Sequence, residues 1–136
     1  MLKVAITCGH GFASGFLAKR LQELTRKEHL EDKVSFVKIP YYEILERQDE
    51  VDIALLLPHV EHYAIADNDK FRIPLYIIPY KVVAGVKAQS FLEDAEDIIA
   101  KAQGKPGICR FDNEENIAQV NRLVSHRAYT LAVAGA

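Results

Sequence analysis

The sequence has few cysteines, little net charge and no long apolar run, and each of these shortages removes a class of protein. The two cysteines, Cys8 and Cys109, lie far apart in the chain, which favours two thiols over a disulfide framework. The longest apolar run covers only residues 53–58, far short of the about 20 residues that a membrane span needs. The formal net charge is −2, with no basic stripe or polybasic cluster, so the charge pattern predicts no nucleic-acid partner and no anionic membrane.

The first residues also lack the features of an export signal. Met1, Leu2 and Lys3 lead straight into a predicted strand, without a charged start, an apolar stretch and a small-residue cleavage site. We therefore expect a cytoplasmic protein. The length of 136 residues, with 49% apolar and 26% charged residues, fits a soluble domain with a single core.

Short apolar segments alternate with amphipathic ones over the first 102 residues. The predicted strands are 2–7, 34–39, 51–57 and 74–78, and the predicted helices are 13–29, 42–47, 59–67 and 88–102. Four strands that alternate with four helices predict an α/β fold with an open, doubly wound, four-stranded parallel sheet and helices on both faces. In such a sheet, ligands bind beyond the carboxyl ends of the strands, where the strand order reverses.

The end of the chain has a different pattern. Asp112, followed three residues later by Glu115, resembles a capping box. Apolar residues then recur at helical spacing, namely Ile117, Val120, Leu123 and Val124. The sequence therefore predicts a domain over 1–104 and an extension over 105–136 that adds a C-terminal helix packed on the same domain.

The residue with the most evident chemistry is Cys8, in the turn that joins the first strand to the first helix. A helix N-terminus presents unpaired N–H groups, which favour a thiolate over a thiol and form a cradle for a phosphate. Gly9 and Gly11 allow the backbone to approach a ligand closely. Ser14 can add a hydroxyl donor, and a cationic His10 can steady a dianion.

Two groups that would hydrolyse a phosphocysteine are missing from the sequence. A cysteine-dependent phosphatase loop places an arginine six residues after the cysteine, where this chain has Ser14. No aspartate follows the fourth predicted strand to act as a general acid, because Pro79, Tyr80 and Lys81 stand there. A phosphoryl group on Cys8 would therefore persist, as a carrier requires.

These features resemble the enzyme IIB proteins of the phosphoenolpyruvate-dependent sugar phosphotransferase system, in the lactose/cellobiose (chitobiose) family. The resemblance covers roughly residues 1–102, and its motifs are the loop that starts at Cys8, the segment Leu57-Pro58-His59-Val60, and Ile73-Pro74 before the fourth strand. It implies that Cys8 accepts a phosphoryl group from a histidine of a IIA protein and passes it to a sugar bound by the IIC membrane permease. It implies no cofactor, and it implies that the phosphate is held by Gly9, His10, Gly11, Phe12, Ala13 and Ser14.

The chain departs from the family pattern at several positions. Ala13 and Gly15 stand where relatives usually carry hydroxyl side chains, and His59 stands where glutamine is usual. We keep Gly15 and His59 as further candidates for the site. His59 and His62 could also suggest a metal, but without a supporting carboxylate or cysteine cluster we expect none.

The residues themselves leave two other functions open. A low-molecular-weight-type cysteine phosphatase or arsenate reductase shares the placement of the loop, although it would need the missing arginine and acid. A non-catalytic IIB-like module with a regulatory binding role agrees with the departures at Ala13 and Gly15. The sequence names neither the sugar nor the oligomeric state.

Overall fold

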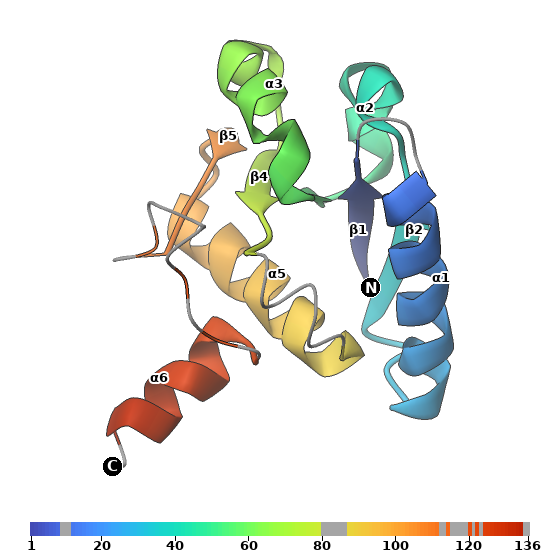
Figure 1. The fold of residues 1–136 in the computed structure, drawn as a ribbon, viewed down its shortest axis with the longest axis vertical. Helices are drawn as coiled ribbons and strands as arrows, with labels where there is room; N and C mark the ends of the chain where they lie inside the picture. The colour runs from blue at the N-terminus through green and yellow to red at the C-terminus, as the bar shows by residue number, and fades with distance from the viewer. Residues whose placement is uncertain are drawn as a thin grey trace.

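The centre of the molecule is a sheet of parallel strands in the order β2-β1-β3-β4-β5 (Figure 1). The computed structural model describes residues 1–8, 12–79, 87–111, 114, 120, 122 and 124–134, with backbone only at 12–15 and 131–134. The strands are β1 (Leu2–Thr7), β2 (Val34–Lys38), β3 (Ile53–Leu56), β4 (Pro74–Ile77) and β5 (Gly107–Ile108).

Each strand pairs in parallel with its neighbours, and the side chains of β1 alternate between two apolar layers. Val4, Ile6 and Cys8 belong to one core cluster, and Ala5 belongs to the other. β3 is buried at every position. The sheet is therefore covered on both faces, which explains why β3 is continuously apolar.

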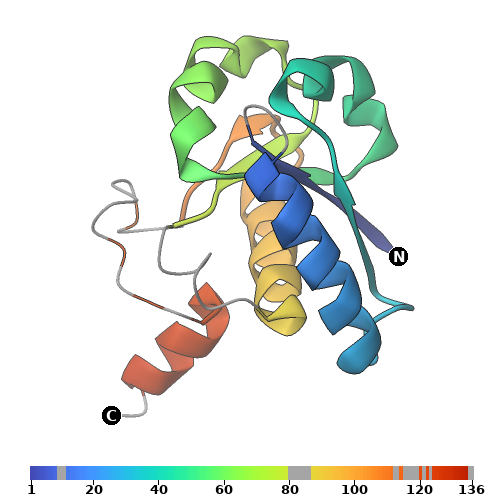
Figure 2. The same cartoon turned by 45° about the vertical axis from the view of Figure 1, so that its right-hand side comes forward.

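The helices divide between these two faces (Figures 1 and 2). α1 (Phe12–Lys27) and α5 (Ala88–Ala102) pack against each other and against the face that carries Cys8. α2 (Tyr41–Arg47) and α3 (Glu61–Ala66) cover the opposite face. No helix in the described part of the chain is long and apolar enough to cross a membrane.

The predicted class, an open parallel α/β sheet with helices on both faces, is confirmed, but the sheet has five strands where the sequence predicted four. β5 is too short to show a periodicity. It is specified by a tertiary contact, because the N–H of Ile108 donates to Asn68 Oδ1 at 2.8 Å. Gly107 adopts a φ of 94°, and a Cβ at this position would lie 2.7 Å from the Asn68 side chain.

The predicted C-terminal helix is present, but it begins later than the capping pattern indicated. α6 spans His126–Ala134, whereas Glu114, Val120 and Arg122 are not helical. Asp112, Glu115, Ile117 and Leu123 lie outside the described residues. The signal that the prediction missed is Ser125, whose Oγ accepts the N–H of Ala128 at 3.1 Å and so caps α6.

A buried ionic cluster attaches the C-terminal segment to β4 and α5. The Arg122 side chain donates to Asp94 at 3.1 Å, to Glu114 at 2.9 Å and to the hydroxyl of Tyr76 at 2.7 Å. Its guanidinium also lies 5.6 Å from the centre of the Phe111 ring. Loss of one member of such a cluster leaves buried charge uncompensated.

We therefore expect Arg122→Met to lower the free energy of unfolding by about 3–5 kcal/mol, because Asp94 and Glu114 would lose their shared cation. Chemical denaturation would measure the loss. Arg127→Met is the control, because Arg127 is exposed and its bond to Asp97 lies on the surface, where such pairs contribute about 0–1 kcal/mol. Equal losses in the two variants would contradict the role of the buried cluster.

The pH dependence of stability offers a separate test of this cluster. Burial raises the pKa of Asp94 to about 6, against the opposing attraction of the Arg122 guanidinium. This pKa lies above that of an aspartate in the unfolded chain, which is about 3.9. Asp94 therefore contributes stability at low pH that is lost as the pH rises through about 6. We therefore expect the free energy of unfolding, measured by urea titration, to fall between about pH 4.5 and about pH 7.5. The fall should be on the order of 2 kcal/mol larger in the wild type than in Asp94→Asn. Parallel pH curves for the two proteins would rule out this effect.

Candidate functional site

Parallel strands all leave the sheet at one edge, and this edge carries the residues that the sequence analysis singled out. The residues at or just after the ends of the first four strands are Cys8, Pro40, Pro58 and Pro79. The N–H of Leu57 donates to the carbonyl of Thr7 at 2.9 Å, so pairing between β1 and β3 continues up to the point where both chains turn.

The strand order reverses between β1 and β3. α1, which follows β1, lies on one face of the sheet, and α2, which leads toward β3, lies on the other. Such a switch point is where open α/β sheets bind their ligands. Cys8 and the 3₁₀ turn η2 (Pro58–Val60) are the segments that flank it.

Cys8 itself is buried, with only 2% of its surface exposed. Its side chain belongs to the core cluster shared with α1 and α5, and its carbonyl accepts the N–H of Tyr41 at 2.8 Å. Cys8 forms no disulfide. The nucleophile predicted from the sequence therefore lies at the expected edge of the sheet, at the boundary between the core and the turn.

The rest of the predicted phosphate loop is described only in part. Gly9, His10 and Gly11 lie outside the described residues, whereas α1 begins at Phe12 and includes Ala13, Ser14 and Gly15. The first turn of a helix has N–H groups without intrahelical partners. Residues 12–15 thus place such groups a few residues after Cys8, and the oxyanion site itself stays a prediction.

His59 lies in η2 and is exposed, next in the chain to the buried Val60. β1 and β3 are direct neighbours, so the fold brings the His59 segment alongside the end of β1. The ring of His62 instead lies tilted against that of Tyr63, with ring centres 4.0 Å apart. Among the residues that the structure describes, no group of three or more histidine, cysteine or acidic side chains is arranged to hold a metal.

Tyr41 is the residue that the sequence analysis did not place in the site. Its backbone N–H donates to the carbonyl of Cys8, and its hydroxyl donates to Asp67 Oδ2 at 2.7 Å. Its position directly after Pro40, at the start of a helix that follows a strand, is the signal that could have indicated this role. Tyr80, at the end of the fourth strand, lies outside the described residues.

Cys109 is a useful contrast to Cys8. It is half-buried beside α5, and its Sγ lies 3.9 Å from the carbonyl oxygen of Ile98. Burial raises the pKa of the Cys109 thiol. Cys109 is therefore disfavoured as a thiolate and serves as an internal control for cysteine chemistry.

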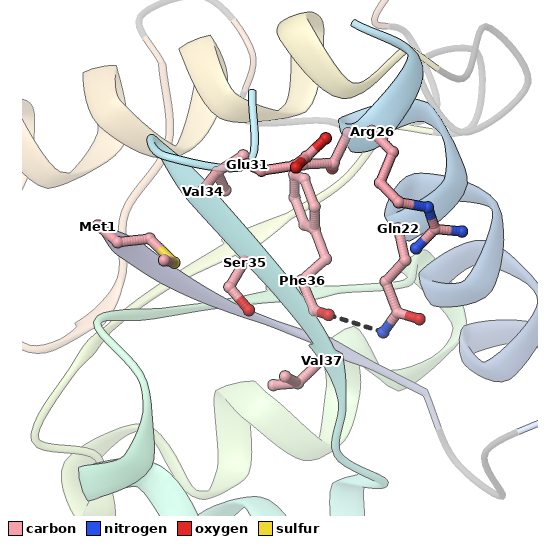
Figure 3. Close-up of a pocket in the computed structure, with 9 residues that line it drawn as sticks. Met1, Gln22, Arg26, Glu31, Val34, Ser35, Phe36 and Val37 are labelled. Carbon is pink, nitrogen blue, oxygen red and sulfur yellow. Dashed lines mark hydrogen bonds between the residues drawn. The ribbon is translucent and has the colours of Figure 1, made fainter. Parts of the chain in front are cut away.

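Two hollows in the described part of the chain lie away from Cys8. One, of about 430 Å³, runs along β2 and is bordered by Gln22 and Arg26 of α1 (Figure 3). There, Gln22 Nε2 donates to the carbonyl of Phe36 at 2.9 Å and so occupies an acceptor on the outer edge of the sheet. The other, of about 590 Å³, is lined by Met1, Val51 and neighbouring residues at the amino ends of the strands. Neither has the position expected for chemistry at Cys8.

Comparison with known proteins yields one family and a structural relative. A family model described as the lactose/cellobiose-specific IIB subunit of the PTS system matches residues 3–101. A similar solved structure is the lactose-specific IIB component domain of the phosphoenolpyruvate:carbohydrate phosphotransferase system from Streptococcus pneumoniae. The two chains share 23% identity with a TM-score of 0.44, over 51% of this chain and 64% of the length of the other. The comparison with curated proteins gave no match.

Proposed function

Because the chain belongs to the lactose/cellobiose-specific IIB family of the phosphotransferase system, we propose that it carries a phosphoryl group on Cys8 between two partners. The family resemblance seen in the sequence is confirmed by the match over residues 3–101. The observation that carries the proposal is the position of Cys8, directly after β1 at the switch point of the sheet.

The proposed reaction consists of two in-line displacements. In the first, the Cys8 thiolate attacks the phosphorus of a phosphohistidine on a IIA protein, a P–S bond forms, and the P–N bond breaks. In the second, a hydroxyl of a sugar bound by the IIC permease attacks the same phosphorus, the P–S bond breaks and returns the Cys8 thiolate, and the hydroxyl proton passes to solvent. Both steps depend mainly on alignment and on stabilisation of phosphate charge. On this basis the protein is a cytoplasmic phosphotransferase.

Within this scheme, Cys8 is the nucleophile and the residues from Gly9 to Ser14 supply backbone N–H groups to the phosphate. His10 and His59 are candidates to contact the charged phosphate. Gly15 is a candidate position for the close approach of a partner protein. Since Cys8 is 2% exposed, transfer also requires its surroundings to open when a partner arrives. The chain has Ser14 where a cysteine-dependent phosphatase has its arginine, which supports the role of a carrier over that of a phosphatase.

We expect Cys8→Ser to abolish phosphoryl uptake and Cys109→Ser to leave it unchanged. Each protein would be incubated with phosphoenolpyruvate, the general phosphotransferase proteins and candidate IIA donors, and the phosphate would be located by mass spectrometry of peptides. Equal loss in both variants would refute the assignment of the nucleophile.

The same experiment separates the alternative functions. Absence of uptake from every IIA donor would favour the regulatory binding module. Rapid hydrolysis of p-nitrophenyl phosphate that depends on Cys8 would favour the phosphatase.

A donor protein that reaches Cys8 must also cover the surface around the start of α1. Protein–protein interfaces bury about 800 Å² on each partner and rely on a few aromatic anchors. Phe16, one turn into α1, is 78% exposed and is therefore a candidate anchor at this place.

We expect Phe16→Ala to raise KM for the phosphorylated IIA donor about tenfold while kcat changes less than about twofold, because contact with the donor is lost but the transfer geometry remains. Steady-state transfer kinetics would measure both constants. Tyr129→Ala is the control, since Tyr129 is 42% exposed on α6, away from the start of α1. An unchanged KM for Phe16→Ala would exclude Phe16 from the docking surface.

A further inference from the structure

Tyr41 connects segments from both sides of the switch point. Its backbone N–H donates to the carbonyl of Cys8 at 2.8 Å, and its phenol donates to Asp67 Oδ2 at 2.7 Å. Tyr41 is the first residue of α2, and Asp67 directly follows α3. A single residue therefore links the end of β1, through its backbone N–H, and the end of α3, through its side chain, to the start of α2.

We propose that Tyr41 is a positioning residue for phosphoryl transfer, because its phenol–Asp67 bond holds the start of α2 where the Tyr41 N–H fixes the Cys8 carbonyl. This inference rests on the proposed function and adds a residue to it. A peptide group is planar, so whatever holds the Cys8 carbonyl also sets the orientation of the peptide that leads from the nucleophile into the loop. A small rotation of that peptide would misalign the in-line transfer.

The phenol of Tyr41 is well placed to act as an anchor. Its ring packs against the core cluster under α2 and α3, and its centre lies 5.5 Å from that of Tyr63. The hydrogen bond from Tyr41 lowers the pKa of the Asp67 carboxyl, while burial and Asp67 together raise the pKa of the Tyr41 phenol. A neutral phenol therefore donates to an ionised carboxylate, which is a charge-assisted hydrogen bond.

The other end of this link is also held in place. Glu61, the first residue of α3, pairs with Arg110 at 2.6 Å, and Asn68 accepts the N–H of Ile108 at 2.8 Å. Ile108 is the last residue of β5, and Arg110 follows it two residues later. α3 is thus fixed to the sheet edge on one side, so Asp67 offers the Tyr41 phenol an acceptor that is itself held in place.

The test is Tyr41→Phe, which removes the hydroxyl but keeps the ring and the backbone N–H. Tyr42→Phe is the matched control, because it makes the same change at the next residue, which is 71% exposed. Loss of the anchor should speed amide hydrogen exchange at residue 41 about tenfold, since that amide reports directly on the bond to Cys8. It should lower kcat for transfer from the IIA donor about tenfold, with KM unchanged, because alignment is lost while docking remains.

Alkylation by iodoacetamide provides a readout that does not depend on phosphoryl transfer. We expect Tyr41→Phe to make Cys8 react about fivefold faster, because its buried surroundings loosen, while Cys109 in the same molecule keeps its rate. A cysteine that is more accessible but transfers phosphate more slowly is the signature of lost positioning. A general loss of stability would affect both cysteines.

A second pair of variants guards against an effect of Tyr41→Phe on folding. Asp67→Asn keeps an acceptor for the phenol, so its exchange rate at residue 41, its kcat and its alkylation rate at Cys8 should stay near those of the wild type. Asp67→Ala removes the acceptor, so the same three values should resemble those of Tyr41→Phe. The double variant Tyr41→Phe/Asp67→Ala should change exchange, kcat and alkylation no more than either single variant does, since both substitutions remove the same bond.

Unchanged exchange at residue 41 in Tyr41→Phe would overturn the proposal, and so would faster exchange with unchanged kcat and unchanged alkylation. If the wild type takes up no phosphate, the proposed function fails by itself. The exchange and alkylation measurements then decide whether Tyr41 positions Cys8.

Discussion

Parallel pairing of β1 with β2 on one side and β3 on the other determines what surrounds Cys8. Because all three strands run in the same direction, the segments that follow them leave the sheet at the same edge. α1 turns to one face and α2 to the other, so the end of β1 lies where the helical layers diverge. Cys8, Tyr41 and His59 come together only through this arrangement, since they follow three separate strands.

The C-terminal segment depends on a different kind of interaction. Residues 102–136 lie outside the family match, yet Arg122 reaches Tyr76 and Asp94, which lie within it. Burial of one arginine with two carboxylates costs desolvation that hydrogen bonds must offset, and here each carboxylate receives at least one of them. The segment also adds β5 to the sheet and pairs Arg110 with Glu61 at the start of α3. Residues beyond the family region therefore hold an element close to the candidate site.

Sequence patterns predicted the elements that carry a strong local signal. β1 and α5 have the expected bounds, and the other paired strands and helices of the first 102 residues differ from them by a few residues at their ends. β5 was missed because two residues show no periodicity, and α6 was misplaced because the apolar spacing after Asp112 suggested a helix that Glu114, Val120 and Arg122 do not form. Cys8 was found because a cysteine in a strand-to-helix turn has a recognisable chemistry. Tyr41 was not, because its contacts are with residues far from it in sequence.

The sequence alone determined the class of the fold, the family and the residue on which the chemistry is proposed to occur. These follow from local properties, namely apolar periodicity, turn residues and a short motif, which remain visible in a linear chain. Only the tertiary structure decided that Cys8 is buried, that Tyr41 joins it to Asp67, and that Arg122 is enclosed between Asp94 and Glu114. Burial and long-range hydrogen bonds arise when distant segments pack together, and no local pattern records which residues will meet.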